Sequence, residues 1–131
     1  LFTETMLLYC GAQHPLFGAD HSALTWETLR AYQFAGLGYH SPNMQLSHSA
    51  RLPRKATGFD QESIATLILS GRYLGFLPDH YAESFERQGL MQAVQPAQFF
   101  YPCQFVSVLP KSPQPPRAAQ AFAQCLLAAH G

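Results

Sequence analysis

Apolar positions change from helical to strand spacing within residues 61–78, and the rest of the predicted fold is organised around this stretch. Ile64, Leu67 and Ile68 recur three and four residues apart, which places them on one face of a short helix. Residues 73–77 then form an apolar and aromatic run of the kind found in buried strands. A helix followed closely by a buried strand predicts an α/β core.

Polar residues and glycine mark the ends of these two elements. Asp60 is a candidate N-cap, and Glu62 adds negative charge to the first helical turn, where the helix dipole favours it. Gly71 stands where a left-handed C-cap is expected, and Pro78 ends the strand. The predicted helix therefore has a defined start and a defined end.

A second helix follows directly. Asp79 is its candidate cap, Tyr81, Ala82 and Phe85 are expected to face inward, and Gly89 ends it.

The first half of the chain carries two further strands. Residues 6–10 are continuously apolar, which is typical of a strand covered on both faces, and Gly11 ends this run. Thr25 is a plausible N-cap for a short helix over residues 26–32, and residues 34–37 form the next strand.

Weaker patterns complete the prediction. They give a helix over 43–50, strands over 55–59 and 90–94, a long strand over 99–109, and a C-terminal helix over 117–130 with an apolar stripe of Ala119, Phe122, Ala123 and Leu126. The sequence as a whole predicts an α/β fold with a mixed sheet flanked by helices.

Composition narrows the class of protein. The chain has 131 residues, enough for one domain or one lobe of a larger one, and eight basic and eight acidic residues give a formal net charge of zero. A neutral chain carries no sign of nucleic-acid binding by itself. Three widely spaced cysteines do not form a disulfide framework and favour a reducing compartment, so we predict a cytoplasmic location. No apolar run is long enough to span a membrane. Because the chain opens without Met, directly in a strand-like run, we expect it to be part of a longer protein.

Two motifs resemble a known family. Residues 70–78, SGRYLGFLP, resemble the V-x-x-G-x-G-x-x-x-L-P segment in the C-terminal effector-binding domain of LysR-type transcriptional regulators. Arg72 and Tyr73 depart from that pattern, because many members have a smaller pair there. His14-Pro15-Leu16 is similar to the "HPL" that follows the family's first crossover strand.

The resemblance extends over nearly the whole order of predicted elements and implies a type II periplasmic-binding-protein-like lobe. Residues 1–104 would be the second lobe, including a crossover strand at 5–9. Residues 105–131 would be the second crossover strand, at 105–109, and a helix that returns to the first lobe. Most of the first lobe and the N-terminal winged helix-turn-helix would lie outside this chain, so DNA would be a partner only through that missing part. The family also implies a homo-oligomer, with residues 64–69 as a candidate interface.

The candidate ligand site lies at the carboxyl ends of the strands. Ligands of open α/β sheets bind there, against loops and helix N-termini that present free backbone donors. The candidate residues are Gly38, Tyr39, His40, Ser41, Gln61 and Ser63. The resemblance implies that these two segments line the second-lobe side of an effector cleft. A purely structural interpretation also stands, in which Ser41 and Ser63 cap helices and Tyr39 is a surface aromatic. Asp60 and Glu62 are expected to act on the helix, since they would repel a carboxylate.

Other chemistries find no support in the sequence. Six histidines and three cysteines show no zinc-ligand spacing, and no P-loop, G-x-S-x-G or G-x-G-x-x-G motif is present. Cys10, Cys103 and Cys125 lie in apolar surroundings, where thiols are usually inert, although some members of the family sense oxidants through second-lobe cysteines. We predict no enzymatic activity, no cofactor and no metal.

We therefore predict the effector-sensing domain of a LysR-type DNA-binding transcriptional regulator. The alternative is a lobe of a periplasmic-type solute-binding protein, which shares the fold. The sequence leaves the effector open among small organic acids, aromatic compounds and amino-acid-like molecules.

Overall fold

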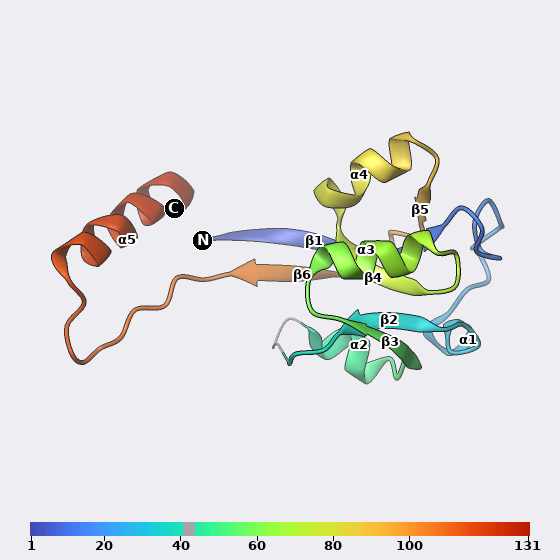
Figure 1. Cartoon of the computed structure of the whole chain (residues 1–131), viewed down its shortest axis with the longest axis horizontal. Helices are drawn as coiled ribbons and strands as arrows, with labels where there is room; N and C mark the ends of the chain where they lie inside the picture. The colour runs from blue at the N-terminus through green and yellow to red at the C-terminus, as the bar shows by residue number, and fades with distance from the viewer. Residues whose placement is uncertain (41–43) are drawn as a thin grey trace.

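The computed structural model describes residues 1–40 and 44–131, and it contains a mixed sheet with helices on both faces (Figure 1). The strands are β1 (Phe2–Gly11), β2 (Phe34–Leu37), β3 (Arg54–Gly58), β4 (Leu74–Pro78), β5 (Met91–Ala93) and β6 (Phe100–Phe105). The helices are α1 (Trp26–Leu29), α2 (Gln45–Ser49), α3 (Gln61–Leu69), α4 (Asp79–Arg87) and α5 (Arg117–His130).

The sheet combines parallel and antiparallel pairing. Its strand order is β3-β2-β4-β1-β5, and β6 also pairs with β1. Strand β2 is parallel to β3 and β4, whereas β1 is antiparallel to β4, β5 and β6. The predicted α/β class and mixed sheet are confirmed.

Strand β1 is covered on both faces, as its continuous apolar run predicts. Leu8 and Cys10 belong to one buried cluster, which includes residues of β4, β6 and α1. Tyr9 belongs to the other, which includes the inner faces of α3 and α4. Side chains alternate across a strand, so each face of the sheet receives its own core from the same stretch of sequence.

Helix α3 has the ends that the sequence predicts. The Asp60 carboxylate accepts a hydrogen bond from the backbone N–H of Ser63 at 2.7 Å, which satisfies a donor of the first turn. Gly71 adopts a φ of +75°, and a Cβ on this residue would come within 2.8 Å of the Gln13 side chain. Glycine is therefore required there both by backbone conformation and by space.

Two predicted helix boundaries are wrong. Asp79 is not an N-cap: it is the first residue of α4, and its carboxylate accepts from the His80 N–H within the first turn. Pro78 holds the cap position because β4 runs into α4 without a linker. Helix α1 ends at Leu29 and not at residue 32, since the chain must extend at Gln33, whose carbonyl accepts from Leu74 N–H on β4.

Strand β6 is shorter than predicted. It ends at Phe105, not at residue 109, because β1, the strand with which it pairs, begins at Phe2, directly opposite Phe105. Beyond that point Val106 and Val108 have no strand to pair with and are 71% and 83% exposed.

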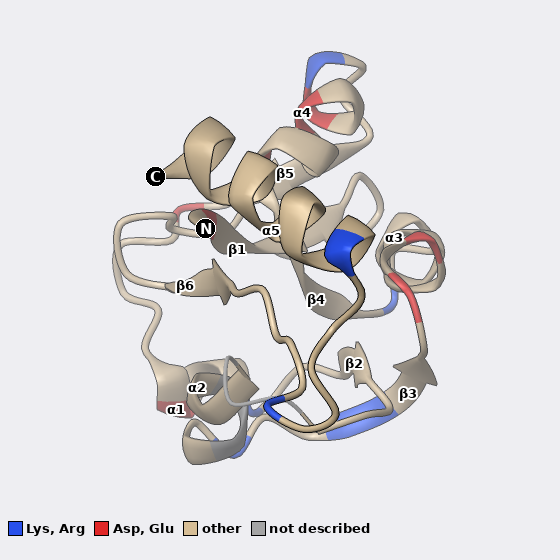
Figure 2. Ribbon diagram, turned by 90° about the vertical axis from the view of Figure 1, so that its left-hand side faces the viewer, with Lys and Arg blue, Asp and Glu red and all other residues tan. Residues whose placement is uncertain are grey.

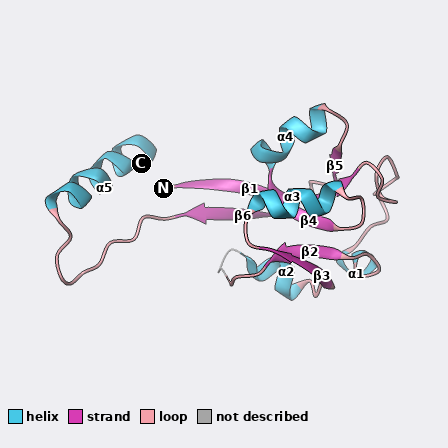
Figure 3. Cartoon of the chain, viewed as in Figure 1, coloured by secondary structure: helices cyan, strands magenta, loops and turns pink. Residues whose placement is uncertain are grey.

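The C-terminal segment leaves the body of the protein. Residues 106–116 run outward and lead to α5, which lies apart from the sheet (Figures 1 and 3). The predicted bounds of α5 are confirmed, but none of its residues is buried, and Phe122 and Leu127 are 65% and 61% exposed. A ring contact joins His130 of this helix to Phe2 at the chain's other end, with a centroid separation of 5.3 Å. Phe122 of the predicted stripe is therefore left open, whereas Ala119, Ala123 and Leu126 are partly buried.

Helix α3 uses its apolar face for the core. Ile64, Ala65 and Ile68 are buried against the sheet, whereas Leu69 is 37% exposed. The buried three, which the sequence assigned to a candidate oligomer interface, are thus occupied within the chain.

Replacing Ile68 with alanine should lower the free energy of unfolding by about 2–5 kcal/mol, because the change leaves a cavity between α3 and the sheet. Leu69→Ala, one residue further on the same helix, should change it by less than about 1 kcal/mol, since this side chain keeps contact with solvent. Urea denaturation of both variants measures the difference. Equal losses would show that α3 does not pack as described.

Candidate functional site

The segments that carry the candidate residues meet at one end of the sheet. The loop after β2 and the N-terminus of α3 lie on the side from which the C-terminal arm extends (Figure 1). Gly38 N–H donates to the carbonyl of Gly58 at 2.8 Å, which joins the ends of β2 and β3. Gly58 in turn lies against Ser63, because a Cβ on this glycine would come within 2.8 Å of the Ser63 Cβ. The two predicted segments are thus linked through Gly58.

Gly38 is held in a tight environment. A Cβ at this position would come within 2.7 Å of both Thr57 and the Phe59 ring. The missing side chain lets Phe59 lie over the loop, where it remains 71% exposed. Tyr39, the next residue, is 49% exposed. Two aromatic rings therefore face solvent at the carboxyl ends of neighbouring strands.

The remaining predicted residues divide into exposed and partly buried groups. His40 is exposed, and Ser41 lies outside the described residues. Ser63 is half-buried, and its backbone N–H is already bonded to Asp60. Gln61 is half-buried, and within the described part of the chain its buried Oε1 has no hydrogen-bond partner. A buried acceptor without a partner costs free energy, so a hydrogen-bond donor placed against the Gln61 Oε1 at this end of α3 would be favourable.

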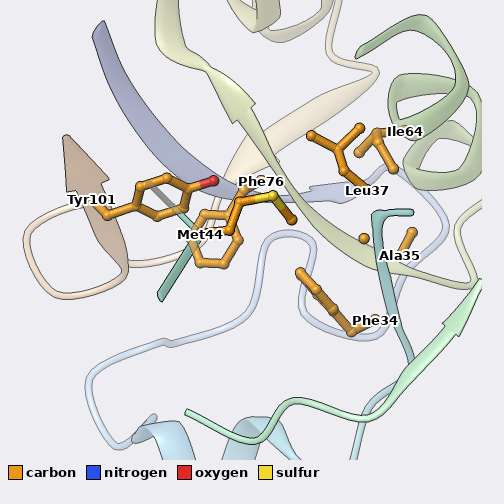
Figure 4. A pocket seen from close by; sticks show the side chains of 8 residues that line it. Phe34, Ala35, Leu37, Met44, Ile64, Phe76 and Tyr101 are labelled. Carbon is orange, nitrogen blue, oxygen red and sulfur yellow. The ribbon is translucent and has the colours of Figure 1, made fainter. Parts of the chain in front are cut away.

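The structure adds a small apolar cavity that sequence reasoning missed. Its volume is about 20 Å³, room for roughly one water molecule. It is lined by Phe34, Ala35, Gly36, Leu37, Met44, Ile64, Phe76 and Tyr101. In Figure 4, Met44 and Phe76 lie between Tyr101 on one side and Leu37 and Ile64 on the other. These residues come from five separate elements or connections, so no local spacing brings them together.

Tyr101 connects this cavity to the predicted loop. Burial raises the pKa of its phenol, and the nearby Cys103 and Tyr39 act in the same direction.

The positively charged side chain of Arg54 lies beside the cavity. The Arg54 guanidinium donates to the carbonyl of Leu37 at 2.9 Å. Its aliphatic stem crosses Gly36, where a Cβ would come within 2.9 Å of the arginine Cδ.

At the start of α3, hydrogen bonds from Ser63 hold the pKa of Asp60 below its usual range, so this carboxylate is ionised at neutral pH. The charged residues are few and spread over several elements (Figure 2).

The described residues offer little for metal chemistry, and of the three cysteines expected in apolar surroundings only Cys10 is buried, whereas Cys125 is exposed. In residues 1–40 and 44–131, no group of three or more His, Cys, Asp or Glu side chains is placed to hold a metal ion. Burial raises the pKa of the Cys10 thiol to about 11, which keeps it protonated at neutral pH. None of the helices in this part of the chain is long and apolar enough to cross a membrane.

Comparison with known proteins identifies relatives over the whole chain. The family model described as LysR substrate binding domain matches residues 1–131. The HTH-type transcriptional activator BauR of Pseudomonas aeruginosa is 27% identical over 126 residues. That alignment covers 96% of this chain but only 41% of BauR, so the chain spans less than half the length of this relative.

Solved structures share the fold at low sequence identity. The regulatory domain of CcmR from Synechocystis PCC6803, solved in complex with 2-PG, is 17% identical with a TM-score of 0.61, over 98% of this chain and 64% of that one. ArtJ, the arginine-, lysine-, histidine-binding protein of Geobacillus stearothermophilus, is 10% identical with a TM-score of 0.62, over 98% and 55%. Regulatory domains and a solute-binding protein thus have this fold in common, which confirms the periplasmic-binding-protein-like architecture.

The Asp60 cap should make the stability of this end of α3 depend on pH. Because the pKa of Asp60 is lowered in the folded state, its contribution is present above the unfolded pKa and is lost as pH falls through the folded pKa. Asp60→Asn keeps a capping side chain without the charge. The wild-type protein should therefore melt at a higher temperature than the variant at pH 7, and this advantage should disappear in the acid range below about pH 4. A difference in melting temperature that does not change with pH would contradict the charged cap.

Proposed function

The chain belongs to the LysR substrate binding domain family, and from this membership we propose that it senses a small-molecule effector on behalf of a LysR-type transcriptional regulator. The observation that carries the proposal is the convergence of the loop after β2, the start of α3 and the apolar cavity at one end of the sheet. That end lies on the same side of the body as the exposed arm (Figure 1).

We propose that residues 1–104 form the second lobe and residues 105–131 return to the first. The exposed apolar side chains of α5 support this division, because Phe122 and Leu127 remain 65% and 61% exposed. A first lobe packed on this stripe would stand opposite the carboxyl ends of β2 and β3. The effector would then be enclosed between two lobes, as is common for small-molecule sites.

Each side chain at this end offers a distinct contribution to binding. Tyr39 and Phe59 present exposed rings for apolar or aromatic contact. The unpartnered Oε1 of Gln61 can accept a hydrogen bond from the effector, and Ser63 and His40 are further polar groups at the same end. Gly38 permits close approach of the backbone.

The response would be a population shift. An effector that contacts both lobes favours the inter-lobe angle in which both sets of contacts form, by as much as its affinity differs between the two states. The two crossover segments, at β1 and after β6, are where such a change of angle would bend the chain. DNA-binding domains elsewhere in the full protein would read the change, so we propose DNA as a partner only through them.

The same proposal covers assembly and location. We propose a homo-oligomer in the cytoplasm, with an interface that excludes the buried face of α3. A role in catalysis is not part of the proposal, because the family is defined by effector binding. The solute-binding alternative shares only the fold with this chain, as the likeness to ArtJ at 10% identity illustrates.

Tyr39→Ala should weaken effector binding by about tenfold or more, since it removes an exposed ring at the cleft. Ser63→Ala should weaken it by a smaller factor. A screen of small acids, aromatic compounds and amino acids by thermal shift identifies a ligand, and calorimetry then measures the affinity of each variant. Glu83→Ala, on exposed α4, is the control. If all three variants bind as the wild-type protein does, the site lies elsewhere.

Phe122→Ala should affect stability differently in the 131-residue chain and in a longer protein. In the 131-residue chain it should leave the melting temperature nearly unchanged, because Phe122 is exposed. In a longer protein that contains a first lobe, it should lower the free energy of unfolding by about 3 kcal/mol, the usual cost of truncating a buried phenylalanine. Unfolding measurements on both proteins decide the point. Insensitivity in the longer protein would show that α5 is not covered by a first lobe.

A further inference from the structure

A second hollow lies at the opposite end of the sheet, with a volume of about 360 Å³. Its walls come from the His14-Pro15 turn, the chain between α1 and β2, and the residues that follow α3. Gln33 immediately precedes β2 and Gly71 follows α3, so this hollow lies at the amino end of β2, away from the effector-binding end. The His14-Pro15 turn and Arg72, which departs from the family pattern, meet here.

His14 presents a hydrogen-bond donor to this hollow. The side chain is only 5% exposed, and its Nδ1 accepts the backbone N–H of Leu16 at 3.1 Å. Burial lowers the pKa of His14, so the ring is neutral at pH 7. With Nδ1 acting as an acceptor, the neutral ring must carry its proton on Nε2. The Tyr32 ring lies against the imidazole at a centroid distance of 5.3 Å.

The rest of the lining is also rich in donors. Arg72 is exposed, and its guanidinium forms no ion pair with the described carboxylates. The Gln33 amide adds a further donor, and no Asp or Glu lines the hollow.

We propose that this hollow is a binding site for a small organic anion, with a carboxylate or phosphate group held by Arg72, the Nε2–H of His14 and Gln33. A guanidinium fork matches the oxygens of either group, and hydrogen bonds to a charged acceptor are stronger than neutral ones. The volume lies at the lower end of the range for ligand pockets and is large enough for a molecule of a few heavy atoms. This site is separate from the effector site and does not depend on the first lobe.

Nuclear magnetic resonance titration tests the proposal. The protein is titrated with sodium acetate or with inorganic phosphate, at constant ionic strength set by sodium chloride, and acetamide serves as the uncharged probe. Acetate and phosphate distinguish a carboxylate from a phosphate ligand. Saturable shifts are expected at the Leu16 and Gln33 amides and at the Arg72 Nε–H, with little response to acetamide.

Arg72→Gln should raise the Kd of the bound anion about tenfold. Arg87→Gln, which removes an exposed cation from α4 on another part of the surface, should leave it unchanged. Because both positions are exposed, neither variant should disturb folding. An anion that binds equally well to the Arg72→Gln protein, shifts that never saturate, or equal losses in the two variants would each overturn the proposal.

Discussion

The pairing of β1 with three other strands is the constraint on which the rest of the structure depends. Along its length β1 meets β6, β4 and β5, and its side chains supply both cores. A polar residue at Leu8 or Tyr9 would therefore destabilise the core on one face of the sheet, because these positions are fully buried. The outer half of β1 has a different role: from Phe2 to Thr5 it pairs only with β6. The same strand thus anchors the body and forms half of the two-stranded ribbon that leaves it.

That ribbon explains the unusual distribution of apolar surface. Phe2 and Phe105 stack on each other with ring centroids 4.6 Å apart, yet both remain partly exposed. Further out, Val106, Val108, Phe122 and Leu127 are exposed. Isolated apolar residues are common on protein surfaces, but a connected set along one arm indicates a surface that another body covers. The arm extends from the side on which the proposed effector-binding end lies, so one partner lobe would cover both (Figure 1).

The fold was predictable from sequence wherever local chemistry decides it. We predicted β1 from the apolar run at residues 6–10, and the ends of α3 from Asp60 and Gly71. Burial on two faces, capping and positive φ each have a recognisable local sequence pattern. The errors arose where tertiary neighbours decide. Strand β6 stops at Phe105 because β1 begins opposite it, and Asp79 enters α4 because β4 leaves no room for a cap residue. The cavity escaped prediction for the same reason, since Met44, Phe76 and Tyr101 meet only after folding.

Helix α3 and strand β2 relate the two proposed sites to each other. Both elements run from one end of the body to the other, so the effector-binding end has their Gly38 and Ser63 termini, and the anion hollow has Gln33 and Gly71 at the opposite termini. Between those ends lie Ala35, Ile64 and Ile68, which are buried in one close-packed cluster. Close-packed elements move as units and do not deform gradually, so a ligand at either end acts on the same rigid pair. Communication between the sites would require a second arrangement of this pair that the two ligands favour to different extents. The structure contains one arrangement of α3 and β2, so we expect the two proposed sites to bind their ligands independently.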